Sequence, residues 1–140
     1  MNARTTSAPR PTICEIATEA SLLAVRASLR TAAAELGFGI VGQTKLITAA
    51  SELTRNILRY AGRGTMVIER VQDGGRVGLR ARFADNGAGI ADIELALQDG
   101  YSTNNSMGVG LSGARRLVDD FHIESELGKG TVVEITAWAR

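Results

Sequence analysis

Glu52 and Asn56 are a first pair of side chains whose types and spacing suit chemistry. They lie four residues apart in the segment ELTRN, and on a helix this spacing places both on one face. A carboxylate can orient or deprotonate a hydroxyl group, and an amide oxygen is a ligand that Mg²⁺ accepts beside water and phosphate oxygens. Taken alone, the pair is more simply explained as the solvated surface of a helix.

The segment DNGAG, Asp85 to Gly89, is a second candidate. Asp85 ends a predicted strand, so its carboxylate can project into a pocket at the sheet edge and accept hydrogen bonds from an exocyclic amine such as that of adenine. Gly87 and Gly89 allow the backbone to approach a ligand closely or to adopt a positive φ. The simpler interpretation is a turn after a strand, since Asp, Asn and Gly are common turn residues.

Three glycines, Gly108, Gly110 and Gly113, stand directly before or within a predicted helix start in the segment GVGLSG. Free N–H groups at a helix start attract anions, and glycines let several such groups turn toward one phosphate. The spacing differs from that of the dinucleotide-binding fingerprint, and a Walker loop is excluded because no Gly-Lys-Ser/Thr follows. The polar run before the glycines is either a flexible loop or a loop that folds over bound phosphates.

Thr131 follows the glycines of the segment GKGT, at the start of the last predicted strand. It can reach a pocket beside Asp85 if the two strands are neighbours in the sheet. Taken alone, this segment is better explained as a hairpin turn.

Hydrophobic periodicity predicts the elements that must position these residues. We expect strands over 12–18, 65–71, 77–84, 121–127 and 131–138, and helices over about 22–36, 41–61, 90–98 and 111–120. The hairpin segment QDGG between two strands favours a largely antiparallel or mixed sheet. Each helix has one apolar face, so the predicted fold is an α/β (α+β) two-layer sandwich with the helices on one face of the sheet.

Length and composition limit the class of protein. A chain of 140 residues argues for one domain, and we expect a short disordered tail over 1–11 followed by a single domain over 12–140. The net charge of +1 indicates no general attraction to nucleic acid or to a membrane surface, and no apolar run approaches the ~18 residues of a membrane span. One cysteine and one histidine exclude an internal disulfide and a multi-histidine metal site. These features predict a cytoplasmic protein.

In this order, the segments ELTRN, DNGAG, GVGLSG and GKGT closely resemble the GHKL superfamily of ATP-binding domains, which includes gyrase, the Hsp90 chaperones, sensor histidine kinases and MutL. The resemblance covers about residues 12–138 and implies the Bergerat ATP-binding fold, with ATP or ADP and Mg²⁺ as ligands. Within the superfamily, ELTRNILRYAG and residues 96–125 look most like the stand-alone serine kinases of the RsbT type, the stressosome switch kinase, and also resemble the RsbW anti-sigma factor group.

The resemblance implies a role for each matching position. Glu52 would be the catalytic residue that orients or deprotonates the substrate hydroxyl, Asn56 would bind Mg²⁺, and Asp85 would bind the adenine amino group. Further contacts with ATP would come from Gly87, Gly89, Gly108, Val109, Gly110, Leu111, Gly113 and Thr131. A short ATP lid would be formed by Ser102, Thr103, Asn104, Asn105 and Ser106.

The implied function is an ATP-dependent protein serine/threonine kinase of a bacterial partner-switching stress response. It would phosphorylate STAS-domain antagonist and scaffold proteins of the RsbS and RsbR kind, and when released from them it would activate a PP2C-type phosphatase or another output protein. The alternative is an anti-sigma factor or a nucleotide-gated binding module with little kinase turnover. The target serine or threonine, the pathway and the choice between monomer and homodimer stay open.

The predicted lid, YSTNNSM, contains no Lys or Arg, although some anti-sigma kinases are understood to carry a lid cation at the γ-phosphate. Arg115, Arg116 and Lys129 are the nearest candidates in the sequence, and Lys129 is interpreted as solvated surface. Phosphate transfer is therefore expected to be slow, or to depend on a cation from a partner.

Overall fold

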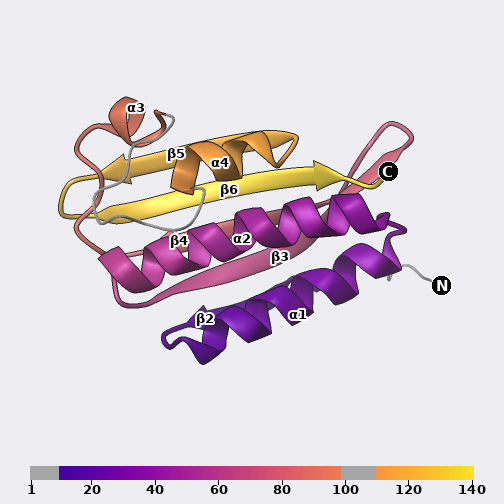
Figure 1. Ribbon diagram of the computed structural model, residues 1–140, viewed down its shortest axis with the longest axis horizontal. Coiled ribbons are helices and arrows are strands. Elements are labelled where there is room, and N and C mark those ends of the chain that lie inside the picture. The colour runs from indigo at the N-terminus through magenta and orange to yellow at the C-terminus, as the bar shows by residue number, and fades with distance from the viewer. Residues whose placement is uncertain (1–9, 99–109) are drawn as a thin grey trace.

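The computed structural model describes residues 10–98 and 110–140, and Figure 1 shows helices lying along one face of a sheet. In chain order the elements are β2 (Thr12–Ile16), α1 (Ala20–Glu35), α2 (Ile40–Tyr60), β3 (Gly64–Asp73), β4 (Arg76–Asp85), α3 (Ile93–Ala96), α4 (Gly110–Arg116), β5 (Asp120–Glu126) and β6 (Gly130–Trp138). Arg10 and Pro11 are the only described residues of the expected tail, so the division into tail and domain stays a prediction.

The sheet has five strands in the order β2-β3-β4-β6-β5, and each neighbouring pair among the described strands is antiparallel. The predicted hairpin joins β3 to β4, where Gly74 adopts a φ of 61° and Asp73 pairs with Arg76. The expected two-layer α/β fold is therefore confirmed, with a fully antiparallel sheet in the described part of the chain.

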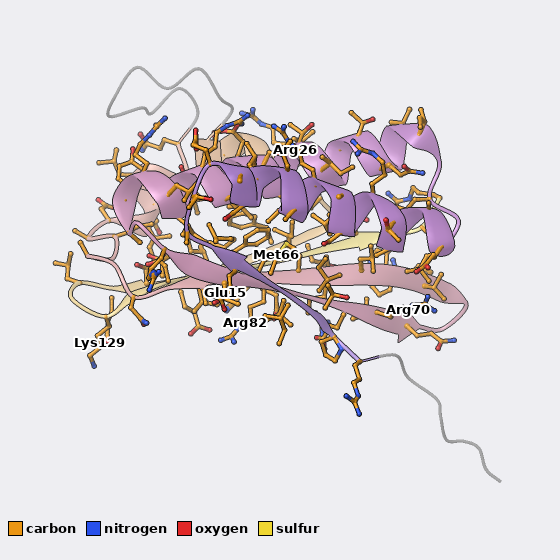
Figure 2. All side chains as sticks on the ribbon, turned by 90° about the horizontal axis from the view of Figure 1, so that it is seen from below. Glu15, Arg26, Met66, Arg70, Arg82 and Lys129 are labelled. Atoms are coloured by element: carbon orange, nitrogen blue, oxygen red, sulfur yellow. The ribbon has the colours of Figure 1, made fainter. Side chains whose placement is uncertain are left out.

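Alternate residues of the strands fill the space between the sheet and the helices. Met66 of β3 and Phe83 of β4 are buried there in one hydrophobic core together with Leu29 of α1 and Leu53 of α2. Figure 2 shows Met66 between the two layers, whereas Arg82 lies on the face of the sheet that the helices leave open. Full burial of such apolar side chains contributes about 1.5–3 kcal/mol each, so this interface holds the two layers together.

Local hydrogen bonds determine where α1 begins and ends. Gly37 takes a φ of 85°, and its N–H donates to the carbonyl of Ala34 at 3.1 Å, so α1 ends within a residue of the predicted helix end at 36. The first strand is shorter than predicted because the N–H groups of Ala17 and Thr18 both donate to Ser21 Oγ, at 3.0 and 3.2 Å, and turn the chain into α1.

The predicted helix over 111–120 is wrong at its C-terminal end, because α4 ends at Arg116 and Asp120 already belongs to β5. The N–H of Asp119 donates to the carbonyl of Thr136 at 3.0 Å, and its carboxylate accepts the N–H of Trp138 at 2.8 Å. These bonds tie Asp119 to β6, so the chain must leave the helix before this residue.

No helix among the described residues is long and apolar enough to cross a membrane.

Gly130, at the start of β6, should be irreplaceable in the fold. Its φ is 95°, and a Cβ on it would lie 2.1 Å from the carbonyl oxygen of Asp85. We expect Gly130→Ala to lower the free energy of unfolding by about 2–4 kcal/mol, from overpacking and backbone strain together. Urea denaturation measures this. Gly75→Ala is the matched control, because its Cβ would meet nothing within 4 Å, and it should change stability by less than about 0.5 kcal/mol. Equal effects of the two variants would contradict the prediction.

Candidate functional site

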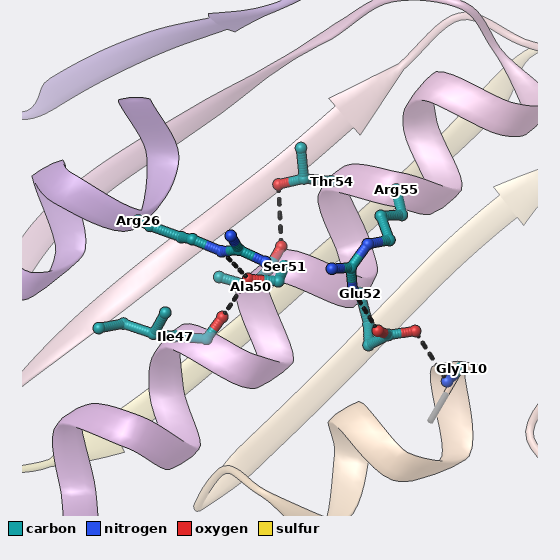
Figure 3. Close-up of polar contacts among 8 residues, drawn as sticks. All are labelled: Arg26, Ile47, Ala50, Ser51, Glu52, Thr54, Arg55 and Gly110. Carbon is teal, nitrogen blue, oxygen red and sulfur yellow. Dashed lines mark hydrogen bonds and ion pairs between the residues drawn. The ribbon is translucent and has the colours of Figure 1, made fainter. Parts of the chain in front are cut away.

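Glu52 is a buried acid on α2, with 5% of its surface exposed. Its Oε2 lies 2.6 Å from Nη1 of Arg55, and its Oε1 accepts the N–H of Gly110 at 3.1 Å (Figure 3). Burying an unpaired carboxylate would be costly, and these two contacts offset that cost. A solvated helix surface, the simpler explanation of this residue, is therefore wrong: α4 packs against α2 at this point and covers the carboxylate.

Asn56 lies one turn further along α2 and is half-buried. Its amide has no hydrogen-bond partner within residues 10–98 and 110–140, so its oxygen is available to a ligand. In the same described ranges, no group of three or more His, Cys, Asp or Glu side chains could hold a metal ion. One amide oxygen fits Mg²⁺ only if waters and phosphate oxygens complete the coordination, which is the arrangement this ion usually accepts.

Asp85 and Thr131 face each other across β4 and β6, as the register of the sheet pairs them directly. The two strands are thus neighbours, which is the condition under which Thr131 was expected to reach a pocket beside Asp85. Oδ1 of Asp85 accepts the N–H of Gly87 at 2.8 Å, which fixes the carboxylate and leaves Oδ2 for another donor. The binding of adenine by Asp85 and the support of the adenine end by Thr131 stay predictions.

Gly87 and Gly89 are required by the packing of the loop that follows Asp85. A Cβ on Gly87 would lie 2.7 Å from the Cβ of Ala61 at the end of α2, and one on Gly89 would lie 2.2 Å from the carbonyl oxygen of Glu126. The close approach that these glycines allow is therefore an approach to other parts of the protein. Their contact with a nucleotide remains a prediction beside this structural role.

Gly110 begins α4 with a φ of 66°, and its N–H points to Glu52. Leu111 is half-buried against the hydrophobic core and Gly113 is buried. Gly108 and Val109 lie outside the described residues, as do all five predicted lid residues. Phosphate binding by this segment therefore stays a prediction. Within the described residues, the N–H of Gly110 donates to the buried carboxylate of Glu52.

Two residues of this region were not predicted. Ser125 Oγ accepts the N–H of Ile90 at 2.8 Å and lies 2.7 Å from Thr131 Oγ1, so it ties the loop after Asp85 to β6. A single serine in a strand carries no signal in a sequence. Arg55 was detectable, because an arginine three residues after Glu52 on a helix is well placed for an ion pair.

The basic residues considered as substitutes for a lid cation lie elsewhere. Lys129 is 75% exposed and lies 3.5 Å from Glu126, which agrees with its interpretation as solvated surface. Arg115 and Arg116 are both exposed, on the last turn of α4, whereas Glu52 contacts the first residue of that helix. Among these described contacts, Arg55 is the basic side chain that touches the acid.

The described part of the chain thus combines an antiparallel sheet that helices cover on one face, an acid and an amide one turn apart on α2, and the glycine-led helix α4 beside that acid. Residues 42–140 match the family described as histidine kinase-, DNA gyrase B-, and HSP90-like ATPase. The chain belongs to this family, and the expected superfamily is thereby confirmed.

Individual proteins of known kind also resemble the chain along its sequence. It is 46% identical over 125 residues to the serine/threonine-protein kinase RsbT of Bacillus subtilis (strain 168), which covers 89% of this chain and 94% of that protein. It is 30% identical over 97 residues to the anti-sigma F factor of Thermoanaerobacter sp. (strain X514), covering 65% and 66% of the two chains. These similarities confirm the expected likeness to the RsbT group and agree with the expected enzyme class, a protein serine/threonine kinase.

Two solved structures share the fold. The structure of the RsbU and RsbW domains of a Mycobacterium tuberculosis protein matches with a TM-score of 0.66 and 23% identity, over 94% of this chain and 33% of that one. The mycobacterial sensor histidine kinase MprB matches with a TM-score of 0.56 and 16% identity, over 94% and 97%. At these identities the likeness concerns the fold alone.

Proposed function

We propose that this chain is an ATP-dependent protein serine/threonine kinase of a bacterial partner-switching pathway. The buried carboxylate of Glu52 carries the proposal. Its side chain is enclosed by α4 and held by Arg55 and Gly110, beside an amide suited to Mg²⁺. A module that only binds nucleotide has no need of an enclosed acid there, whereas a kinase needs a group that receives the proton of the substrate hydroxyl.

The proposed reaction depends on alignment and charge neutralisation more than on covalent chemistry. The hydroxyl oxygen of a substrate serine or threonine attacks the γ-phosphorus of ATP, the bond from phosphorus to the bridging oxygen breaks, and ADP leaves. Glu52 orients the hydroxyl and accepts its proton. Asn56 would hold Mg²⁺, which supplies positive charge to the phosphates, and Asp85 would accept a hydrogen bond from the adenine amino group.

For the partners, we propose STAS-domain antagonist and scaffold proteins as substrates, and a PP2C-type phosphatase or a similar output protein as the target of the released kinase. The 46% identity to RsbT supports a kinase of this group. The 30% identity to an anti-sigma F factor supports the second candidate, a nucleotide-gated module that sequesters a sigma factor or phosphatase with little turnover.

The experiment that tests this function is phosphate transfer from γ-labelled Mg-ATP to purified STAS-domain proteins encoded beside this gene. Label on a serine or threonine of a STAS protein, lost when that residue is changed to Ala, would support the kinase. Absence of label from a sample that binds ATP would overturn it in favour of the binding module. Binding of a sigma factor or phosphatase with and without nucleotide would then identify the partner.

A further inference from the structure

We propose that Arg55 is the cation that contacts the γ-phosphate of ATP in this protein. The inference rests on the proposed kinase function and names one more catalytic residue for it. The first observation is that positive charge is missing from the sequence just before the glycine segment: residues Tyr101 to Met107 contain neither Lys nor Arg. A phosphoryl group in transfer carries negative charge on its equatorial oxygens, and fixed positive charge near them lowers the barrier.

Position is the first argument for Arg55. Glu52 bonds Arg55 through one oxygen, at 2.6 Å, and the N–H of Gly110 through the other, at 3.1 Å. The guanidinium and that N–H therefore flank a single carboxylate, as Figure 3 shows. A γ-phosphate placed for transfer to a hydroxyl held by Glu52 therefore lies beside the guanidinium. Asn56, the residue proposed for Mg²⁺, is the next residue of the chain.

Exposure to solvent is the second argument. The side chain of Arg55 is 42% exposed, whereas that of its partner Glu52 is 6% exposed. Of the two, only the arginine can change partners without first leaving a packed site. Its planar guanidinium can donate two hydrogen bonds to a phosphate, a geometry that a lysine lacks. The exchange also frees Glu52 Oε2, which then accepts the proton of the attacking hydroxyl as the new P–O bond forms and ADP leaves.

Other arginines near the site on α1 and α2 are already engaged elsewhere. Nε of Arg26, on α1, donates to Ser51 Oγ at 3.0 Å, so this side chain approaches α2 next to Glu52 but bonds a hydroxyl. Arg59 lies one turn beyond Arg55, and its guanidinium stands 5.9 Å from the centre of the Tyr60 ring. Arg59 thus offers a matched control with the same charge on the same helix.

The test compares ATP and ADP, because these ligands differ only in the γ-phosphate. Calorimetric titration in the presence of Mg²⁺ would be run on wild type, Arg55→Ala, Arg55→Lys and Arg59→Ala. We expect Arg55→Ala to weaken ATP binding about 10- to 100-fold and ADP binding less than about 3-fold. Arg55→Lys should recover part of the loss, and Arg59→Ala should leave both affinities within about 2-fold.

Equal losses for ATP and ADP, or no loss for either, would show that Arg55 only neutralises Glu52. If Arg55→Ala does not fold, the comparison moves to Glu52→Gln against Glu52→Gln/Arg55→Gln, in which no buried charge is left unpaired, and the same ATP-specific loss is expected. The affinities do not depend on phosphate transfer. A chain that discriminates ATP through Arg55 but labels no STAS protein would overturn the kinase function and leave the contact standing.

Discussion

Glu52→Gln should abolish most phosphate transfer and leave nucleotide binding intact. The Gln side chain has the same length and can still accept the N–H of Gly110 through its amide oxygen, but it cannot take up a proton at neutral pH. Loss of a general base costs about 10²- to 10⁴-fold in rate. Single-turnover transfer from labelled Mg-ATP to a STAS protein measures this loss. Arg55 keeps access to water after the change, so we expect little effect on folding.

Glu69→Gln is the matched control for this prediction. Glu69 lies on β3, outside the helix–sheet core, and forms an exposed ion pair with Arg80 at 3.5 Å. The same chemical change there should leave the transfer rate within about 2-fold of wild type. A Glu52→Gln protein that transfers phosphate at a rate close to wild type would show that the proton goes to another group, and Glu52 would then be an orienting residue only.

Asp85→Asn should weaken ATP binding about 10- to 100-fold. The asparagine keeps Oδ1, which accepts the N–H of Gly87 at 2.8 Å, so the loop should hold its shape. Oδ2 of the aspartate is replaced by the NH₂ group of the asparagine, which would face the amino group of adenine. Because both groups are donors, the hydrogen bond is lost and both groups are left unsatisfied. Fluorescence competition with a labelled nucleotide gives the affinity, and a thermal melt confirms that the variant is folded.

The ligand control is a purine nucleoside triphosphate whose base carries a carbonyl oxygen where adenine carries its amino group. For that ligand, Asp85→Asn should bind at least as well as wild type, because the new amide donor meets an acceptor. Equal losses for both ligands would mean that Asp85 supports the site without contacting the base. Unchanged ATP affinity would remove Asp85 from the binding site.

Much of the fold was predictable because its signals are local. Helical periodicity placed α1 and α2, and alternation with the QDGG turn placed β3 and β4, each to within a few residues. The end of α4 was not predictable, because two hydrogen bonds draw Asp119 out of the helix. Its N–H donates to the carbonyl of Thr136, and its carboxylate accepts the N–H of Trp138; these partners follow it by 17 and 19 residues. No local pattern reports those partners.

By itself, the sequence determined the order of the elements, the antiparallel arrangement of the β3–β4 hairpin and the four segments that resemble the ATP-binding superfamily. These features depend on side-chain periodicity, turn residues and residue types at short spacing. Only the tertiary structure decided that Glu52 is buried, that its carboxylate joins Arg55 to the N–H of Gly110, and that Asp85 pairs with Thr131. Glu52 and Gly110 are 58 residues apart. Contacts of this kind arise when the packing of α4 on α2 brings distant segments together, and that packing is a property of the whole core.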